Sequence, residues 1–152
     1  MLANFIAEVT VYIPDRFKEN RGSFGFQWGN PIPEDHLYFV TIDSPENQKQ
    51  GSQTQLRYSA PYARLSNMTS KNTLESDVDD TPGTAHNLQL EVRGDTASVT
   101  LNGGTPKQFQ LLPGRPRDVV SFTFSDASRE DPGQSLKYEN LVIRSLDRKP
   151  FT

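Results

Sequence analysis

The stretch HNLQLEVRGDTASVTLNGG, residues 86–104, decides the fold class of this chain. Apolar side chains occupy every second position on both sides of the central Gly94-Asp95, which is the period-two pattern of a half-buried β-strand. These residues are Leu88, Leu90 and Val92 before the turn, and Ala97, Val99 and Leu101 after it. The stretch therefore predicts a β-hairpin.

The turn at Gly94-Asp95 sets the register of that hairpin. A two-residue loop pairs Arg93 with Thr96, and in this register every apolar side chain faces an apolar partner across the two strands. Glycine at the first loop position suits a type II′ turn, which requires a positive φ there. Turn chemistry therefore accounts for the Arg-Gly-Asp tripeptide, which is otherwise known as a cell-adhesion signal.

The composition of the 152 residues limits the classes of partner. The net charge is −3 with both signs scattered, which argues against a nucleic-acid groove and against a polybasic membrane surface. No apolar run approaches the length of a membrane span. The absence of cysteine excludes disulfides, thiolate zinc sites and cysteine nucleophiles. We therefore expect neither nucleic acid nor membrane as a partner, and the cellular compartment stays open.

Strand patterns recur along the rest of the chain, and no segment has a convincing helical period. We expect strands within residues 5–13, 23–29, 36–43, 54–66 (broken at Pro61), 107–112, 118–125 and 136–146. Residues 69–85 form the longest polar connection. In the last strand the apolar parity changes between Tyr138 and Leu141, which predicts a bulge near Glu139-Asn140. About ten short strands with Gly- and Pro-containing turns predict an all-β fold, an antiparallel β-sandwich. It forms a single domain over residues 1–152, complete or excised from a larger chain.

Three segments resemble the concanavalin-A-like jelly roll of lectins and glucanases. They are LYFVTID (37–43), LQLEVRGDTASVTLNG (88–103) and YENLVIRSL (138–146). The resemblance includes laminin-G-like domains and the bacterial family of 3-keto-disaccharide hydrolases, and it extends from Phe5 to Leu146. It implies a jelly roll of ten or more strands. Relatives carry an additional segment before their equivalent of the first strand here, so the resemblance implies a strand trimmed off or supplied by another segment.

The acidic sequence ESDVDD, residues 75–80, is the one candidate for catalysis. On a strand, Glu75, Asp77 and Asp79 would project from one face, which is similar to the paired carboxylates of retaining laminarinase-type glucanases. However, Asp80 stands where that pattern has a second glutamate, and the surroundings are rich in Pro and Gly. A solvated acidic loop is the interpretation we favour, so we expect no catalytic residues here and lean against an enzyme.

Calcium is a second interpretation of this loop. Asp77, Asp79 and Asp80 offer the hard oxygen ligands that calcium prefers. The EF-hand pattern fails, because Thr81 and Pro82 stand where that pattern requires an oxygen ligand and a glycine. We expect no metal and no cofactor, although the sequence leaves calcium open.

The two histidines are weaker candidates. His36 and His86 each begin a predicted strand and have no His or Cys partner at ligand spacing. We expect both to be hydrogen-bonded residues at strand ends, and neither a metal ligand nor a general base.

Sugar recognition requires an aromatic ring with amide or charged groups beside it. The candidate ligand-binding residues are Trp28, Asn30, Tyr38, Arg57, Tyr58 and Tyr62, provided that they converge on one sheet face. Alternatively, Trp28 and Tyr38 belong to the core, because Trp28 shares its strand parity with Phe24 and Phe26.

The sequence leaves three functions open. The first is a noncatalytic carbohydrate-binding or ligand-binding jelly-roll module, with a saccharide or a protein as ligand. The second is a protein-interaction or assembly domain that contacts the rest of a larger polypeptide or another chain. The third is a glycosidase-like hydrolase. Fold analogy is the main support for all three.

Overall fold

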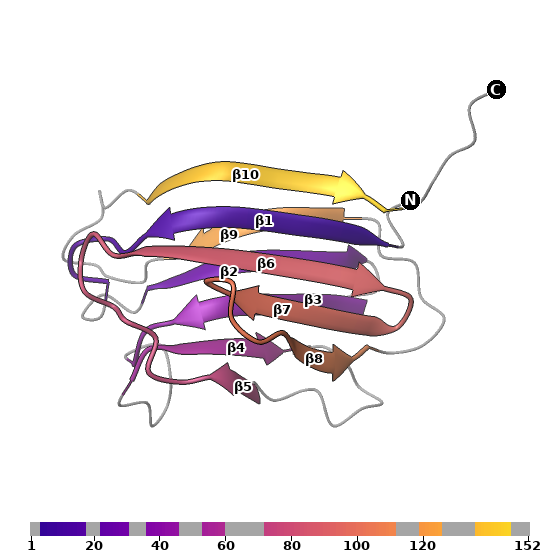
Figure 1. The fold of residues 1–152 in the computed structure, drawn as a ribbon, viewed down its shortest axis with the longest axis horizontal. Helices are drawn as coiled ribbons and strands as arrows, with labels where there is room; N and C mark the ends of the chain where they lie inside the picture. The colour runs from indigo at the N-terminus through magenta and orange to yellow at the C-terminus, as the bar shows by residue number, and fades with distance from the viewer. Residues whose placement is uncertain are drawn as a thin grey trace.

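The computed structural model describes residues 4–17, 22–30, 36–45, 53–59, 72–111, 119–125 and 136–146. Ten strands in these residues form two five-stranded antiparallel sheets that pack face to face (Figure 1). The described residues contain no α-helix, and in particular no helix long and apolar enough to cross a membrane. The predicted all-β sandwich is confirmed.

The first sheet, sheet A, has the strand order β10-β1-β6-β7-β8. Its strands are β10 (Lys137–Ser145), β1 (Phe5–Tyr12), β6 (Ala85–Arg93), β7 (Thr96–Leu101) and β8 (Lys107–Gln110). Sheet B has the order β5-β4-β3-β2-β9. Its strands are β5 (Asn72–Glu75), β4 (Gln55–Ser59), β3 (His36–Asp43), β2 (Ser23–Asn30) and β9 (Val119–Ser125). Sheet B is therefore a meander of four consecutive strands to which the late strand β9 is added.

The hairpin β6–β7 has the register that the sequence predicts. Arg93 pairs with Thr96, and Leu90 pairs with Val99. Gly94 has a φ of 56°, whereas Asp95 is not among the residues with positive φ, as a type II′ turn requires. The Arg93 side chain is exposed at this turn, and the apolar residues of both strands are buried.

The predicted bulge in the last strand is also confirmed. The pairing of β10 with β1 shifts register between Glu8 and Thr10, which lie opposite Val142 and Glu139. Asn140 lies between Glu139 and Val142, where β10 has one residue more than β1. It has a φ of 56°, a conformation that asparagine tolerates better than most residues. The bulge returns Leu141 to the same face as Tyr138.

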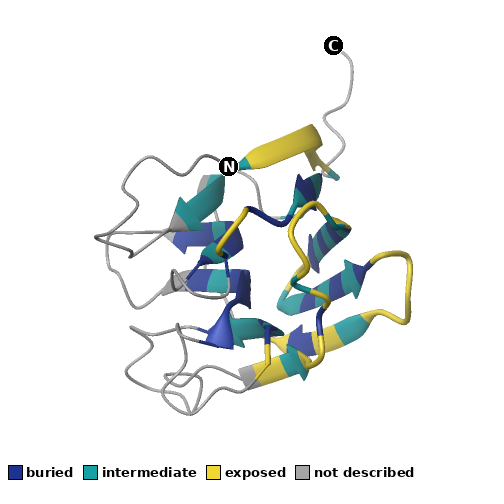
Figure 2. Cartoon of the chain, turned by 90° about the vertical axis from the view of Figure 1, so that its left-hand side faces the viewer, coloured by how far each residue is buried: buried dark blue, intermediate teal, exposed yellow. Residues whose placement is uncertain are grey.

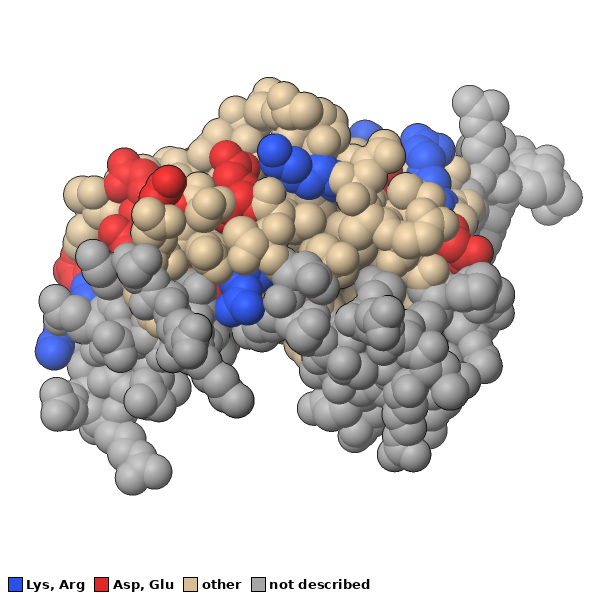
Figure 3. All heavy atoms as spheres, turned by 90° about the horizontal axis from the view of Figure 1, so that it is seen from below, with Lys and Arg blue, Asp and Glu red and all other residues tan. Residues whose placement is uncertain are grey.

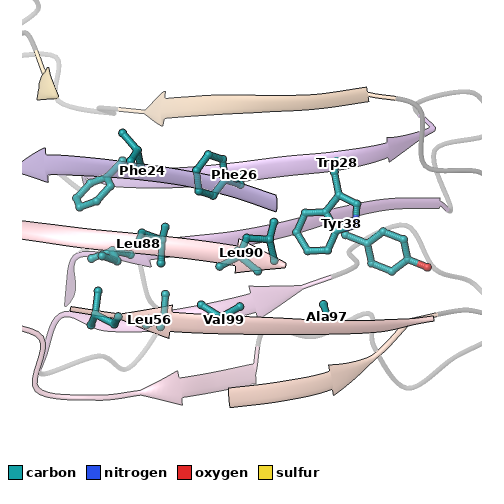
Figure 4. Close-up of a cluster of buried hydrophobic side chains, with 14 of the residues drawn as sticks. Phe24, Phe26, Trp28, Tyr38, Leu56, Leu88, Leu90, Ala97 and Val99 are labelled. Atoms are coloured by element: carbon teal, nitrogen blue, oxygen red, sulfur yellow. The ribbon is translucent and has the colours of Figure 1, made fainter. Parts of the chain in front are cut away.

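The core lies between the sheets and is built from the inward-facing residues of both (Figure 4). Strand β1 shows the alternation clearly, since its burial changes at every residue. The largest side chains with essentially no exposed surface are Trp28, Tyr38, Phe5, Phe17, Phe24 and Phe26. A few large aromatic rings thus fill a thin core, as expected when most residues of a chain are polar.

The sandwich is open on the side where β9 and β10 lie. Figure 1 shows β10 beyond β9, so that no strand of sheet B among the described residues lies opposite it, and Figure 2 shows β10 exposed along its length. The inward-facing side chains of Tyr138, Leu141 and Ile143 keep 50%, 38% and 36% of their surface exposed. From the described part of sheet B, the ring of Phe122 on β9 reaches toward them, with its centroid 5.1 Å from that of Tyr138. We call this region the open side.

Residues 69–85, expected to be a connection, contain the short strand β5, which pairs with β4 at the edge of sheet B. Four residues at an edge have too weak a pattern to be recognised, and their pairing with β4 stabilises the extended conformation. The second short strand expected after Pro61 lies outside the described residues.

Candidate functional site

The outer face of sheet B is mainly polar because of the alternation along its strands. In β3, Tyr38, Val40 and Ile42 point into the core, so the residues between them point outward. We call the outward-facing set of sheet B the polar face. It includes Ser23, Gln27, Phe39, Thr41, Asp43, Gln55, Arg57, Ser59, Thr73, Ser121 and Thr123.

One row of the polar face crosses all five strands of sheet B. In order from β9 to β5 its members are Thr123, Gly25, Thr41, Arg57 and Thr73. Gly25 stands in this row because a Cβ atom there would collide with the backbone oxygen of Val40. The row therefore has hydroxyl groups on both sides of a position without a side chain, and a guanidinium group further along.

The charged centre of the polar face is an ion pair between Asp43 and Arg57. Asp43 is completely buried, and its Oδ1 accepts a hydrogen bond of 2.7 Å from the hydroxyl of Ser23. Nη1 of Arg57 lies 3.9 Å from Oδ2 of Asp43, and 17% of the Arg57 side chain is exposed. Because a buried carboxylate is costly without compensation, Asp43 favours a guanidinium group at this partly exposed position.

Hydrogen-bonding side chains continue beyond this pair toward the edge of sheet B. The hydroxyl of Thr73 on β5 donates to Oε1 of Gln55 on β4 over 3.1 Å, and this contact is exposed. Gln55 in turn lies directly across from Asp43 in the pairing of β4 with β3. The polar face thus offers hydroxyl, amide and guanidinium groups at neighbouring positions, which can bind the hydroxyl groups of a polar ligand.

The structure places Trp28 and Tyr38 in the core, so the expectation that they contact a surface ligand is corrected. Both side chains have essentially no exposed surface. Their rings stack on each other with centroids 5.5 Å apart and an interplanar angle of 22° (Figure 4). The physical reason is the parity that Trp28 shares with Phe24 and Phe26, which turns all three rings inward.

Tyr58 also faces inward. Its ring stacks on Phe109 of β8 with centroids 4.1 Å apart, and this contact joins the two sheets on the side opposite β10. The side chain of Asn30, at the end of β2, and the whole of Tyr62 lie outside the described residues. Arg57 is therefore the one candidate whose described side chain lies on the polar face.

The polar face also carries an aromatic residue, Phe39, that is not among the candidates named from the sequence. Phe39 lies between Gln27 and Ser59 in the pairing of β2, β3 and β4, and its side chain is half-buried. The alternation along β3 could have revealed this position. Val40 and Ile42 belong to the more apolar of the two alternating sets and must face the core, so Phe39 in the other set faces outward.

The acidic segment does not form a strand that carries three carboxylates. β5 ends at Glu75, and Asp77 has a φ of 61°. The backbone N–H of Thr81 donates to Oδ1 of Asp79 over 3.0 Å and holds the pKa of that carboxyl below its ordinary value. This geometry removes the basis for a glucanase-like site, which requires carboxylates on one face of a strand.

A different partner holds the next carboxylate of this segment. Oδ2 of Asp80 accepts a hydrogen bond of 2.7 Å from the hydroxyl of Thr54. Among the residues that the structure describes, no three His, Asp or Glu side chains lie close enough together to hold a metal ion. The geometry of this segment is thus accounted for by hydrogen bonds within the fold.

His86 is a buried, hydrogen-bonded residue at the start of β6, as the sequence predicts. Its Nε2 lies 2.6 Å from the backbone oxygen of Asp79, and its Nδ1 lies 2.9 Å from Nδ2 of Asn102. Since an amide nitrogen can only donate, Nδ1 accepts and Nε2 donates, which defines the neutral Nε2–H tautomer. The side chain of His36 lies outside the described residues.

Charged side chains do not gather into one patch on the side of the molecule formed by β5 and β8. Figure 3 shows acidic and basic residues there, interspersed with uncharged ones, in the part of the chain that is described. This mixed surface agrees with the net charge of −3 and offers no extended field of one sign.

The chain was compared with known proteins. No protein-family model matches the sequence, and no curated protein sequence matches it. Solved structures do match. The carbohydrate-binding module CBM66 from Bacillus subtilis has a TM-score of 0.59 at 10% identity, over 94% of this chain and 76% of that one.

Two further solved structures that match are a galectin and an enzyme. Galectin-Ib from Xenopus laevis has a TM-score of 0.52 at 15% identity, over 95% of this chain and 98% of its own. A β-fructofuranosidase from Aspergillus kawachii has a TM-score of 0.56 at 13% identity, over 93% of this chain and 23% of the enzyme. Identities this low show the fold alone, which is the concanavalin-A-like jelly roll.

Proposed function

We propose that this jelly roll is a noncatalytic carbohydrate-binding module whose ligand lies on the polar face of sheet B. The observation that carries the proposal is the arrangement of Arg57 over the buried carboxylate of Asp43. A guanidinium group held beside a buried carboxylate offers planar N–H donors at a small loss of side-chain freedom on binding. Such preorganised donors suit the hydroxyl and ring oxygens of a sugar.

The neighbours of Arg57 supply the other requirements of sugar recognition. Thr73 lies directly across from Arg57 in the pairing of β4 with β5 and forms an exposed hydrogen bond with Gln55 at the edge. Phe39, two residues before Thr41 on β3, offers an apolar ring that can pack against the C–H groups of a pyranose or furanose. The jelly-roll neighbours that include a carbohydrate-binding module and a galectin support this choice of ligand class.

A glycan array followed by calorimetric titration tests the proposal. Arg57→Lys keeps the charge opposite Asp43 but loses the planar fork, so we expect the affinity for the best glycan to fall about tenfold or more. Arg93→Lys, on the exposed turn of β6–β7, is the matched control and should bind like the wild type. Phe39→Ala should also weaken binding.

Two outcomes contradict the proposal. One is a folded sample that binds no glycan above background. The other is a glycan ligand whose affinity is the same in Arg57→Lys, Phe39→Ala and the wild type, which would place the binding site elsewhere on the molecule.

A protein-assembly domain is the second candidate, and the open side favours it. Four apolar side chains of the edge strand β10 are exposed, namely Tyr138, Leu141, Val142 and Ile143. Edge strands with exposed apolar residues readily pair with other chains. If two copies associate through this edge, the sedimentation coefficient should rise with concentration in the wild type and stay constant in Ile143→Lys. A constant monomer value in both proteins contradicts self-association.

A further inference from the structure

The turn that connects β7 to β8 contains the sequence Asn102-Gly103. Asn102 and Gly103 have φ values of 54° and 69°, and the N–H of Gly104 donates to the carbonyl of Leu101 over 3.0 Å, as in a type I′ turn. Both central residues are exposed to water. Apart from Gly103 and its two neighbours in the chain, no heavy atom lies within 4 Å of the place where a Cβ of Gly103 would stand, so this side of the turn is open.

An asparagine followed by glycine can lose its amide group in a reaction with its own backbone. The backbone nitrogen of Gly103 attacks Cγ of Asn102, forms a C–N bond and releases its proton to water. The bond from Cγ to Nδ2 breaks, and the nitrogen leaves as ammonia. Water then opens the five-membered imide ring at one of its two carbonyl groups and gives aspartate or isoaspartate. Glycine permits this attack because it has no Cβ that shields its nitrogen.

In the folded chain, however, hydrogen bonds hold both polar atoms of the Asn102 amide. Oδ1 accepts from the backbone N–H of Asn87 over 2.7 Å, and Nδ2 donates to Nδ1 of His86 over 2.9 Å. The imidazole itself is fixed by its buried position and by the bond from Nε2–H to the carbonyl of Asp79. For ring closure the amide must rotate toward Gly103, which requires both bonds to break.

We propose that Asn102 is a latent modification site, at which deamidation is restrained by the hydrogen bond to His86. This inference does not depend on the proposed function, because the turn belongs to sheet A and the polar face to sheet B. The modification would change the charge at the end of the β6–β7–β8 unit and break the contact that the amide makes.

The product has a defined effect on His86. A carboxylate at position 102 has no N–H group, so it cannot donate to Nδ1. The contact re-forms only if Nδ1 carries a proton, which makes the imidazole cationic beside the new negative charge. Replacement of one amide by a carboxylate therefore either breaks this contact or converts a neutral pair into an ion pair.

Peptide mass mapping provides a direct test. Trypsin cuts after Arg93 and after Lys107, and Asn102 is the only side-chain amide in the resulting peptide of residues 94–107. We expect slow deamidation in the native chain and fast deamidation in the chain unfolded in urea. His86→Ala should accelerate the folded-state reaction roughly five- to tenfold, which is the factor that corresponds to one net hydrogen bond.

Val92→Ala is the matched control. It removes core packing from the same strand, β6, without touching the amide. If His86→Ala and Val92→Ala accelerate the reaction equally at equal loss of stability, global unfolding controls the rate and the proposal is overturned. The proposal is also overturned if the rate of deamidation at Asn102 is equal in the native and the urea-unfolded wild type, or if Asn102 reacts in neither state.

A second measurement covers the case in which His86→Ala does not fold. In the variant Asn102→Asp, imidazole ¹⁵N shifts at neutral pH should show His86 protonated on both nitrogens, whereas the wild type should show a proton on Nε2 alone. The same protonation state in both proteins would contradict the proposed contact.

Discussion

Replacing Val99 by alanine tests whether the hairpin register fixes the core. Val99 is completely buried on β7 and pairs with Leu90 on β6, next to which Figure 4 shows it. The substitution removes the equivalent of two methylene groups at about 0.8 kcal/mol each, and the residual cavity adds a further cost. We expect a loss of about 2–3 kcal/mol in the free energy of unfolding.

Urea denaturation followed by far-UV circular dichroism measures this loss, with unchanged m-values as the sign that only stability has changed. Ser98→Ala is the control, since the neighbouring residue points away from the core and should change stability by about 0.5 kcal/mol or less. If both variants lose equally little, Val99 does not face the core and the register reasoning fails.

Three further predictions concern other parts of the sandwich. Gly25→Ala should destabilise by about 1–3 kcal/mol in urea denaturation, because its Cβ collides with the backbone oxygen of Val40. The hydrogen bond of 2.6 Å from Tyr12 to Glu139 raises the pKa of that phenol above 10.0. This interaction therefore stabilises the fold fully below pH 10.0 and is lost as the pH rises through the raised pKa. In ultraviolet titrations Glu139→Gln should lower that pKa, and an unchanged titration would contradict the assignment. Trp28 should emit at short wavelength and show no shift with any glycan that binds the polar face, because its ring is in the core.

The hairpin and the bulge were predictable because each depends on neighbouring residues. Turn chemistry at Gly94 fixes the register of β6 with β7, and the parity change around Asn140 requires an extra residue whatever the partner strand is. Local patterns of this kind need no knowledge of the tertiary structure. In contrast, the short strand β5 is defined by its pairing with β4, which a four-residue pattern cannot reveal.

The candidate site was predictable only in part, for a reason visible in β3. Its two alternating sets each contain an aromatic ring, Tyr38 in one and Phe39 in the other, so aromatic content alone does not say which set faces outward. The pair of Asp43 and Arg57 requires the register of β3 with β4, and the connection between them carries no turn signal comparable to Gly94. Arg57 could therefore be named from its residue type, whereas its buried partner could not.

The pairing of β1 with both β6 and β10 has a consequence for how the chain folds. Tyr12 and Glu139, joined across β1 and β10, are separated by 127 positions in the sequence. During synthesis the meander β2–β5 and the unit β6–β7–β8 can assemble early, whereas β1 must wait for β6, and sheet A is complete only after β10 leaves the ribosome. Until those two strands have been synthesised, β1 has neither of its partners, so its apolar face stays unprotected. A nascent chain stalled before β10 would thus leave one edge of β1 open to pairing with other chains.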